Sequence, residues 1–154
     1  MAPFNLLCVT TPTTPRVQIL PLNDTGDHRG SSFTIPAEAI QFVGSVRDLH
    51  LAAILPGTIR GNHYHLRRME AIVVYYHSNW TFHWDEGPVP GDGAADAPEP
   101  PVQRRDFTGS GACVILVTPG CSHAVENRGS QSMTILGISS EAYDPSESVP
   151  RKLI

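Results

Sequence analysis

Two histidines and a glutamate in the stretch IRGNHYHLRRME have types and a spacing that could bind a metal ion. His63 and His65 are separated by one residue, and Glu70 follows five positions after the second histidine. In a β-strand, residues i and i+2 point to the same face, so the two imidazoles would lie side by side. A return strand that begins at Glu70 would bring its carboxylate beside them. Two imidazoles and one carboxylate are a usual ligand set for a divalent metal, and they leave positions open for water or substrate.

A fourth candidate ligand, His123, lies in the stretch PGCSHAVEN, where a Pro-Gly turn precedes a predicted strand. The chain contains seven histidines, so one His-x-His pair could arise by chance and serve only packing. Chance does not account for Glu70, because a carboxylate at the edge of an apolar run is unfavourable to bury without a partner. The four residues together favour metal binding.

Two segments resemble the motifs of the cupin family. Residues 57–70, GTIRGNHYHLRRME, are similar to the first motif, in which a glycine precedes two histidines and a glutamate. Residues 119–127, PGCSHAVEN, are similar to the second, in which a histidine is followed four residues later by an asparagine, here Asn127. The resemblance covers about residues 48–140. It implies a small jelly-roll barrel with a metal ion inside, held by four ligands: His63, His65, Glu70 and His123.

Two positions depart from the family pattern. The glycine that usually closes the first motif is absent, and its place falls at His77. The second motif lacks one residue between its proline and its glycine. Both departures concern turns and leave the implied ligand set complete.

Three further stretches resemble cupins that act on nucleotide-linked deoxysugars. PGTIRGNHYH is similar to the opening of ketoisomerases of that class and of the cupin half of capsular-polysaccharide reductases. HAVENRGSQSMTILGISSEAYDPSESVP is similar to the tail of the reductases, and DHRGSSF to an early segment of deoxysugar 3,5-epimerases. The resemblance implies an isomerase or epimerase that binds a sugar nucleotide.

Isomerising a keto sugar requires a base that removes a proton beside the carbonyl and a group that stabilises the enolate oxygen. A bound metal would fill the second role as a Lewis acid. Alternation along residues 70–76 places Tyr76, rather than Tyr75, on the inward face. His50 shares a face with Ala52 and Ile54, so it is either a lumenal base or a packed core histidine. Tyr76 and His50 are the candidate catalytic residues, and two others stay open: His83 and Tyr143.

Other charged and aromatic residues near the motif have two interpretations each. Arg60 could contact a phosphate or remain solvated, and the pair Arg67 and Arg68 is predicted to lie on an exposed turn. The alternating aromatic stripe of residues 80, 82 and 84 is typical of a core or a dimer interface, and less so of sugar stacking.

The elements that must position these residues are short strands. Two-residue alternation between frequent prolines and glycines predicts an all-β sandwich or barrel. The predicted strands are 17–22, 48–55, 112–119 and 132–143, with a hairpin in 70–84 that turns at Ser78 and Asn79. Residues 36–43 offer a weak helical turn. With the family resemblance, this predicts a single cupin domain over 1–154, a jelly-roll barrel of two antiparallel sheets with its core at about 15–145.

Residues 86–101, EGPVPGDGAADAPEPP, differ in composition from the rest of the chain. They carry four acidic groups and five prolines and no aromatic residue. Such a segment buries too little apolar surface to offset its conformational entropy. We therefore expect a mobile, solvated loop between the two motifs; a functional lid is the lesser alternative.

Charge and cysteine content limit the partners. Eleven basic and 15 acidic residues give a net charge of −4, which argues against nucleic acid or an anionic membrane as a partner. No apolar run approaches the roughly 20 residues that cross a bilayer, and the first residues lack the features of a signal peptide. The three cysteines cannot all pair and form no zinc motif, which favours free thiols in the cytoplasm: Cys8, Cys113 and Cys121.

Three function classes remain open: an isomerase or epimerase of a nucleotide-linked keto sugar, an iron-dependent dioxygenase with the same ligands, and a non-catalytic module that binds a small ligand. The ligand set predicts one divalent transition metal, and zinc, nickel, iron and manganese all suit it. The alternative is that the histidines do acid–base work without a metal, as in some cupins. Exposed edge strands and apolar stripes also predict a homodimer.

Overall fold

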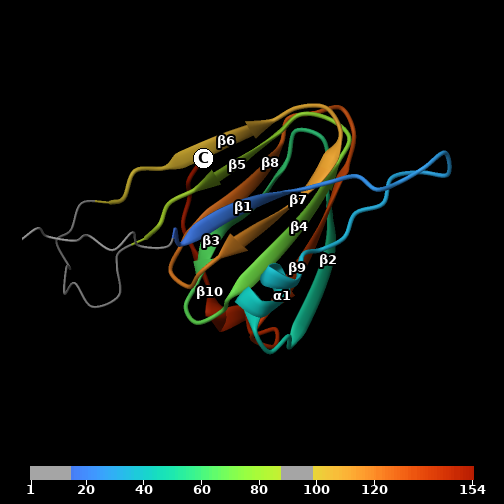
Figure 1. Ribbon diagram of the computed structural model, residues 1–154. Helices are drawn as coiled ribbons and strands as arrows, with labels where there is room; N and C mark the ends of the chain where they lie inside the picture. The colour runs from blue at the N-terminus through green and yellow to red at the C-terminus, as the bar shows by residue number, and fades with distance from the viewer. Residues whose placement is uncertain (1–14, 88–98) are drawn as a thin grey trace, which may run out of the picture.

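The structure, a computed structural model, describes residues 15–87 and 99–154. Two antiparallel sheets of five strands face each other as a barrel (Figure 1). The first sheet has the order β1 (Val17–Leu22), β7 (Gly111–Val117), β4 (Glu70–Tyr76), β9 (Met133–Ser139) and β2 (Asp48–Ile54). The second has the order β10 (Ser148–Pro150), β3 (Ile59–His65), β8 (His123–Asn127), β5 (Trp80–Trp84) and β6 (Gln103–Phe107). The predicted all-β class with two antiparallel sheets is confirmed.

In the described residues, two short helices accompany the sheets. Helix α1, Ala37–Val43, matches the weak helical turn predicted at 36–43 and packs against β4 and β7. Its buried residues Ala39 and Val43 form an apolar cluster with residues of the first sheet that include Ala71 and Leu116. The 3-10 helix η1, Pro145–Glu147, leads into β10. Helix α1 thus covers part of the outer face of the first sheet.

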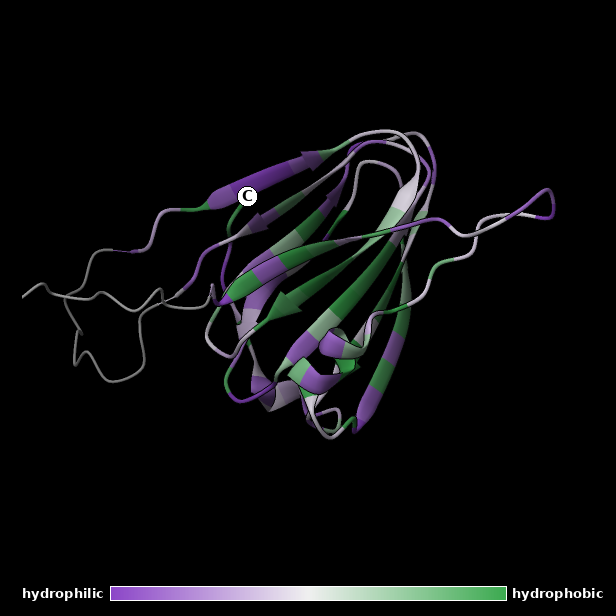
Figure 2. Ribbon diagram, viewed as in Figure 1, coloured by the Kyte–Doolittle hydropathy of each residue, from purple (hydrophilic) through white to green (hydrophobic). Residues whose placement is uncertain are grey.

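The main hydrophobic core lies between the two sheets. Trp80 and Phe82 of β5 are at most 1% exposed and pack with Ile115 and Val74 from the opposite sheet. The central strands of the first sheet are mostly hydrophobic, whereas β6 is hydrophilic (Figure 2). The predicted aromatic stripe is therefore part of the core.

The predicted hairpin in residues 70–84 is wrong. β4 and β5 belong to different sheets, and β4 pairs with β7 and β9 whereas β5 pairs with β6 and β8. Residues 77–79 carry the chain from one sheet to the other. Both strands bury apolar residues in the same core, and alternation alone does not distinguish a hairpin from a crossover of this kind.

The strand predicted at 17–22 has the observed bounds, and the ends of the other three predicted strands lie within four residues of those observed. Two strands were not predicted, β6 because it is charged (QRRDF) and β10 because it has three residues. Most of the loop predicted at 86–101, and Cys8 near the N-terminus, lie outside the described residues. Among the described residues, no helix is long and apolar enough to span a membrane.

A buried ion pair fastens the C-terminal segment to the barrel. Asp85 follows β5 and is fully buried, and Arg151 donates from Nε to its carboxylate at 2.7 Å. The same carboxylate accepts a hydrogen bond from the Gly87 backbone N–H at 3.0 Å. The Leu153 backbone N–H binds the Asn62 side chain at 2.9 Å. Through Asn62, these contacts connect the end of the chain to β3, which carries two candidate ligands.

Candidate metal centre

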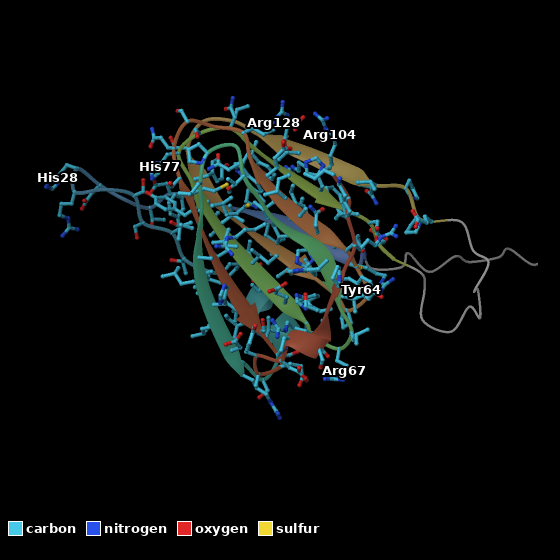
Figure 3. All side chains as sticks on the ribbon, turned by 180° about the vertical axis from the view of Figure 1, so that it is seen from behind. His28, Tyr64, Arg67, His77, Arg104 and Arg128 are labelled. Atoms are coloured by element: carbon cyan, nitrogen blue, oxygen red, sulfur yellow. The ribbon has the colours of Figure 1, made fainter. Side chains whose placement is uncertain are left out.

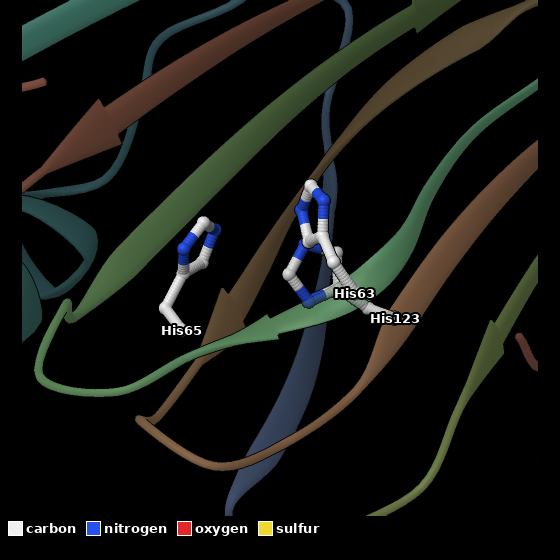
Figure 4. Close-up of side chains that lie close together, drawn as sticks. All are labelled: His63, His65 and His123. Carbon is white, nitrogen blue, oxygen red and sulfur yellow. The ribbon is translucent and has the colours of Figure 1, made fainter. Parts of the chain in front are cut away.

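Three of the predicted ligands gather in one cluster. His63 and His65 come from β3, and His123 begins the neighbouring strand β8, where it pairs directly with His63. The three imidazoles point into one space between the sheets (Figure 4), and one nitrogen of each lies within 4.8 Å of the others. This group of three histidines could hold a metal ion.

A β-bulge in β3 directs the first histidine into the cluster. The register of β3 against β8 shifts between Gly61 and His63, and Gly61 and Asn62 both have positive φ, at 94° and 57°. A Cβ atom at Gly61 would lie only 2.6 Å from the His123 carbonyl oxygen. The position therefore requires glycine for both its conformation and its close approach to β8.

Glu70, the fourth predicted ligand, approaches the cluster from the opposite sheet. Its Oε2 lies 3.5 Å from His65 Nε2 and 3.4 Å from His123 Nε2. Among the described residues this oxygen is buried without a hydrogen-bond partner, as is His65 Nδ1. The two distances are beyond good hydrogen-bond length, and the Glu70 oxygen is orphaned. A group bound between these side chains would satisfy that oxygen.

The charges at the cluster favour the forms that bind metals. Burial, followed by the charges of the two neighbouring histidines, lowers the pKa of His63 to about 4. Burial also lowers the pKa of His123. For Glu70, burial acts to raise the pKa, but contact with His65 and the nearby positive charges outweigh it and lower the pKa to about 2. At neutral pH, Glu70 is an anion and His63 and His123 are neutral, as ligation requires.

A buried glutamate fixes the turn that joins these ligands. Glu147, 1% exposed, accepts hydrogen bonds from the backbone N–H groups of Leu66 and Arg67, both at 3.1 Å. Its other oxygen lies 2.9 Å from Arg67 Nε. Figure 3 shows Arg67 at one end of the barrel, with His77 at the other end. The turn from His65 to Glu70 is therefore held by the C-terminal part of the chain.

The cluster forms one wall of a cavity of about 440 Å³ between the sheets, within the usual range for ligand sites. His50 of β2, Arg60 of β3 and Tyr143 also line this cavity. A Cβ atom at Gly137 would lie 3.3 Å from Glu70 Oε1 and 3.9 Å from His50 Cβ. Glycine at this position therefore leaves room for both side chains. His50 is exposed to the cavity, so it is not the packed core histidine that the sequence also allowed.

Two other candidate bases lie elsewhere. Tyr76 has the predicted inward orientation, but it packs against Trp80 and Phe107 and does not line the cavity. The geometry therefore does not support Tyr76 as a base for this site. His83 also does not line the cavity, and its Nε2 lies 3.0 Å from the Glu126 carboxylate.

The two described cysteines are buried and free. Burial raises the pKa of Cys113 to about 12, and burial also raises the pKa of Cys121. Both thiols stay protonated at neutral pH, as expected for residues that do not act as nucleophiles.

Arg68 contradicts the prediction of an exposed turn. Arg67 is exposed as predicted, but Arg68 is only 8% exposed and lines the cavity. Two adjacent arginines ordinarily indicate a solvated turn, and no signal in the sequence separates them. Arg67 pairs with Glu147, whereas the side chain of Arg68 lines the cavity.

The donor set fits a divalent transition metal. Imidazole nitrogens suit zinc, nickel, iron and copper, whereas magnesium and calcium prefer oxygen ligands. The orphaned Glu70 oxygen and the three clustered imidazoles supply up to four ligands from two sheets. His123 Nδ1 faces the Cys121 carbonyl oxygen at 3.4 Å, which leaves Nε2 directed toward Glu70.

No protein-family model matches the sequence, and no curated protein matches it. Solved structures do resemble it. The sugar 3,4-ketoisomerase QdtA from Thermoanaerobacterium thermosaccharolyticum, in complex with TDP, is 12% identical with a TM-score of 0.61, over 87% of both chains. A variant of QdtA was solved with TDP-4-keto-6-deoxyglucose.

Two further structures have the same fold. ChmJ, a 3'-monoepimerase from Streptomyces bikiniensis in complex with dTDP-quinovose, is 17% identical with a TM-score of 0.67, over 90% of this chain and 70% of that one. The capsular polysaccharide assembling protein CapF from Staphylococcus aureus is 17% identical with a TM-score of 0.56, over 86% of this chain and 35% of that one. The chain has the cupin jelly-roll fold.

Proposed function

We propose that this protein is a metal-binding cupin that isomerises or epimerises a nucleotide-linked keto sugar. One divalent transition metal would be held by four residues: His63, His65, Glu70 and His123. The observation that carries the proposal is the cavity itself, which all four residues line from two sheets. His50 of β2 also lines it and lies near Glu70, on the other side of Gly137. The ligands of the similar structures, TDP and TDP sugars, support the substrate class.

The residues of the cavity supply the parts of such a reaction. His50 is exposed to the cavity and is the proposed base that removes the proton beside the sugar carbonyl. Tyr143, 74% exposed at the cavity rim, is the second candidate for moving a proton. A bound metal would supply Lewis-acid stabilisation of the negative charge that develops on the carbonyl oxygen.

A dioxygenase is the second candidate, because three histidines and one carboxylate also suit ferrous iron. A dioxygenase would consume molecular oxygen and would be active only with iron bound, whereas an isomerase would not consume oxygen. A non-catalytic binding module would show neither oxygen uptake nor proton exchange.

Proton exchange with solvent tests the proposed reaction. We expect metal-loaded protein in D₂O to place deuterium on the carbon beside the carbonyl of TDP-4-keto-6-deoxyglucose. NMR measures this exchange. His50→Gln should slow this exchange by about 100-fold or more, the usual contribution of a general base. His77→Gln is the matched control, since His77 is exposed and lies outside the cavity. Metal-loaded protein that binds the substrate but exchanges no proton would refute the isomerase proposal.

We also propose a homodimer that pairs through β2. β2 is an edge of the first sheet and exposes Leu49 and Leu51, at 63% and 70%. The other edges are blunted: β6 by charges, β10 by its short length and β1 by Pro21. We propose that the partner is β2 of a second copy of the chain, because an edge strand can pair antiparallel with the same strand of another copy.

We expect wild-type protein to be a dimer in analytical ultracentrifugation and Leu51→Lys to be a monomer. A wild-type monomer at high concentration would contradict the proposal.

The reducing cytoplasm remains the proposed location. The two described cysteines, Cys113 and Cys121, are free thiols, which is the usual state of cysteine in a reducing compartment.

A further inference from the structure

Arg68 is a buried cation that forms no hydrogen bond or ion pair within the part of the chain that the structure describes. Its side chain lines the cavity, and the residue is only 8% exposed. Its Nε is buried without a hydrogen-bond partner, and no hydrogen bond or ion pair joins Arg68 to residues 15–87 or 99–154. Arginine is almost never buried unless it is paired.

Other arginines of the same chain are paired. Arg67 binds Glu147 at 2.9 Å, Arg151 binds Asp85 at 2.7 Å, and Arg104 binds Asp106 at 2.7 Å. Two of these carboxylates, Glu147 and Asp85, are themselves almost fully buried. Each of these three arginines therefore has a carboxylate partner within the fold, whereas Arg68 has none at ion-pair distance among the described residues.

The acidic groups near Arg68 do not satisfy the hydrogen-bond donors of its guanidinium. The carboxylates of Glu70 and Asp144 are close enough to interact with its charge, but neither accepts a hydrogen bond from it. Glu70 is directed at His65 and His123 instead, and Asp144 accepts hydrogen bonds from Ser146. The guanidinium donors are thus left for a molecule in the cavity.

We propose that Arg68 is the anion-recognising residue of the cavity, and that the ligand presents an oxyanion, either a phosphate or a carboxylate, beside the histidine cluster. The planar guanidinium fork matches both groups and can hold either one by two parallel hydrogen bonds. Such a contact would supply the hydrogen bonds that the guanidinium lacks within the described residues. The inference rests on the proposed function in one respect, that the ligand occupies this cavity.

The two sources of the oxyanion lead to different ligands. A phosphate would come from the diphosphate of a sugar nucleotide, which would then lie in the cavity beside the histidines. A carboxylate would come from an acidic sugar, whose ring would then lie in the cavity without need of a nucleotide. Arg60 does not decide between them, because it is exposed and its Nε already binds the Ala53 carbonyl oxygen at 3.0 Å.

Calorimetric titration of the metal-loaded protein with TDP, inorganic phosphate and glucuronate tests the proposal. We expect at least one of these probes to bind, and Arg68→Gln to weaken that binding by about 10-fold to 100-fold, the contribution of a hydrogen bond to a charged group. Arg68→Lys should retain part of the affinity, because it keeps the charge and loses the fork. Arg104→Gln is the control: it removes the same charge from the outer surface, where Arg104 and Arg128 both contact Asp106 (Figure 3).

The outcomes separate this inference from the proposed function. If TDP binds wild type and Arg68→Gln equally, the inference is overturned and the sugar-nucleotide proposal stands. If glucuronate binds through Arg68 and TDP does not bind, the inference holds and the sugar-nucleotide substrate is wrong. Failure of all three probes to bind wild type also overturns it. Ligand-free Arg68→Gln should melt within about 3 °C of wild type, since no hydrogen bond is lost; a much lower melting temperature would indicate a structural role instead.

Discussion

Replacing His123 by alanine is expected to abolish tight metal binding and the stability that the metal supplies. The residue is 3% exposed, pairs directly with His63 across the β3–β8 ladder, and faces Glu70 with its Nε2. Loss of a ligand should exceed the roughly 10-fold to 100-fold loss of affinity that follows removal of an outer-shell partner. Affinity is measured by competition with a chelator of known strength.

Stability gives a second measure of the same change. A metal present at about 1,000 times its Kd adds about 4 kcal/mol to the free energy of unfolding, because it binds only the folded state. For a domain of this size that gain corresponds to a melting temperature raised by roughly 8–16 °C. Wild type should show this rise on adding metal, and His123→Ala should show almost none.

The matched control is His50→Ala, which removes a histidine from the same cavity but from outside the cluster. It should keep the metal-dependent rise while losing proton exchange. If His123→Ala binds metal as tightly as wild type, His123 is not a ligand, and the cluster is a group of packed histidines.

The second large effect is expected for Arg151→Gln, which leaves Asp85 buried and without its cation. Removing one partner of a buried ion pair typically destabilises by about 3–5 kcal/mol. Arg151 is itself 24% exposed, so solvent can replace part of the interaction and we expect about 2 kcal/mol. This corresponds to a melting temperature lowered by roughly 4–8 °C. Thermal unfolding of metal-free protein measures it without interference from the site.

Arg104→Gln serves as the control for this prediction as well, because the Arg104–Asp106 pair is exposed, at 60% and 49%. Exposed ion pairs contribute little to stability, so its melting temperature should stay close to that of wild type. Equal effects of the two substitutions would show that Arg151 does not anchor the C-terminal segment.

Much of the fold could be predicted because apolar alternation marks strands that bury one face. The strand at 17–22 has the predicted bounds, and 112–119 differs from β7 only at its ends. The pairing in 70–84 could not be predicted, since a crossover between two sheets and a hairpin have the same local pattern. β6 was missed because only Phe107 of its five residues packs against the core, and its sequence, QRRDF, lacks apolar alternation.

The candidate site could be predicted where it depends on local spacing. Two residues of one strand separated by a single position necessarily share a face, which brings His63 and His65 together. The distance of Tyr76 from the histidine cluster could not be predicted in this way. Alternation along a strand tells which face a side chain is on, but not how far it lies from the cluster. The burial of Arg68 was also hidden, because nothing in the local sequence distinguishes two adjacent arginines in a turn, one of which lines the cavity.

The metal content of purified protein tests the central proposal most directly. After expression in metal-replete medium, elemental analysis should give close to one transition-metal ion per chain. Protein stripped with a chelator should take up one equivalent again, whereas His123→Ala should not. Wild-type protein that contains no transition metal and takes none up on titration would contradict the proposed metal centre.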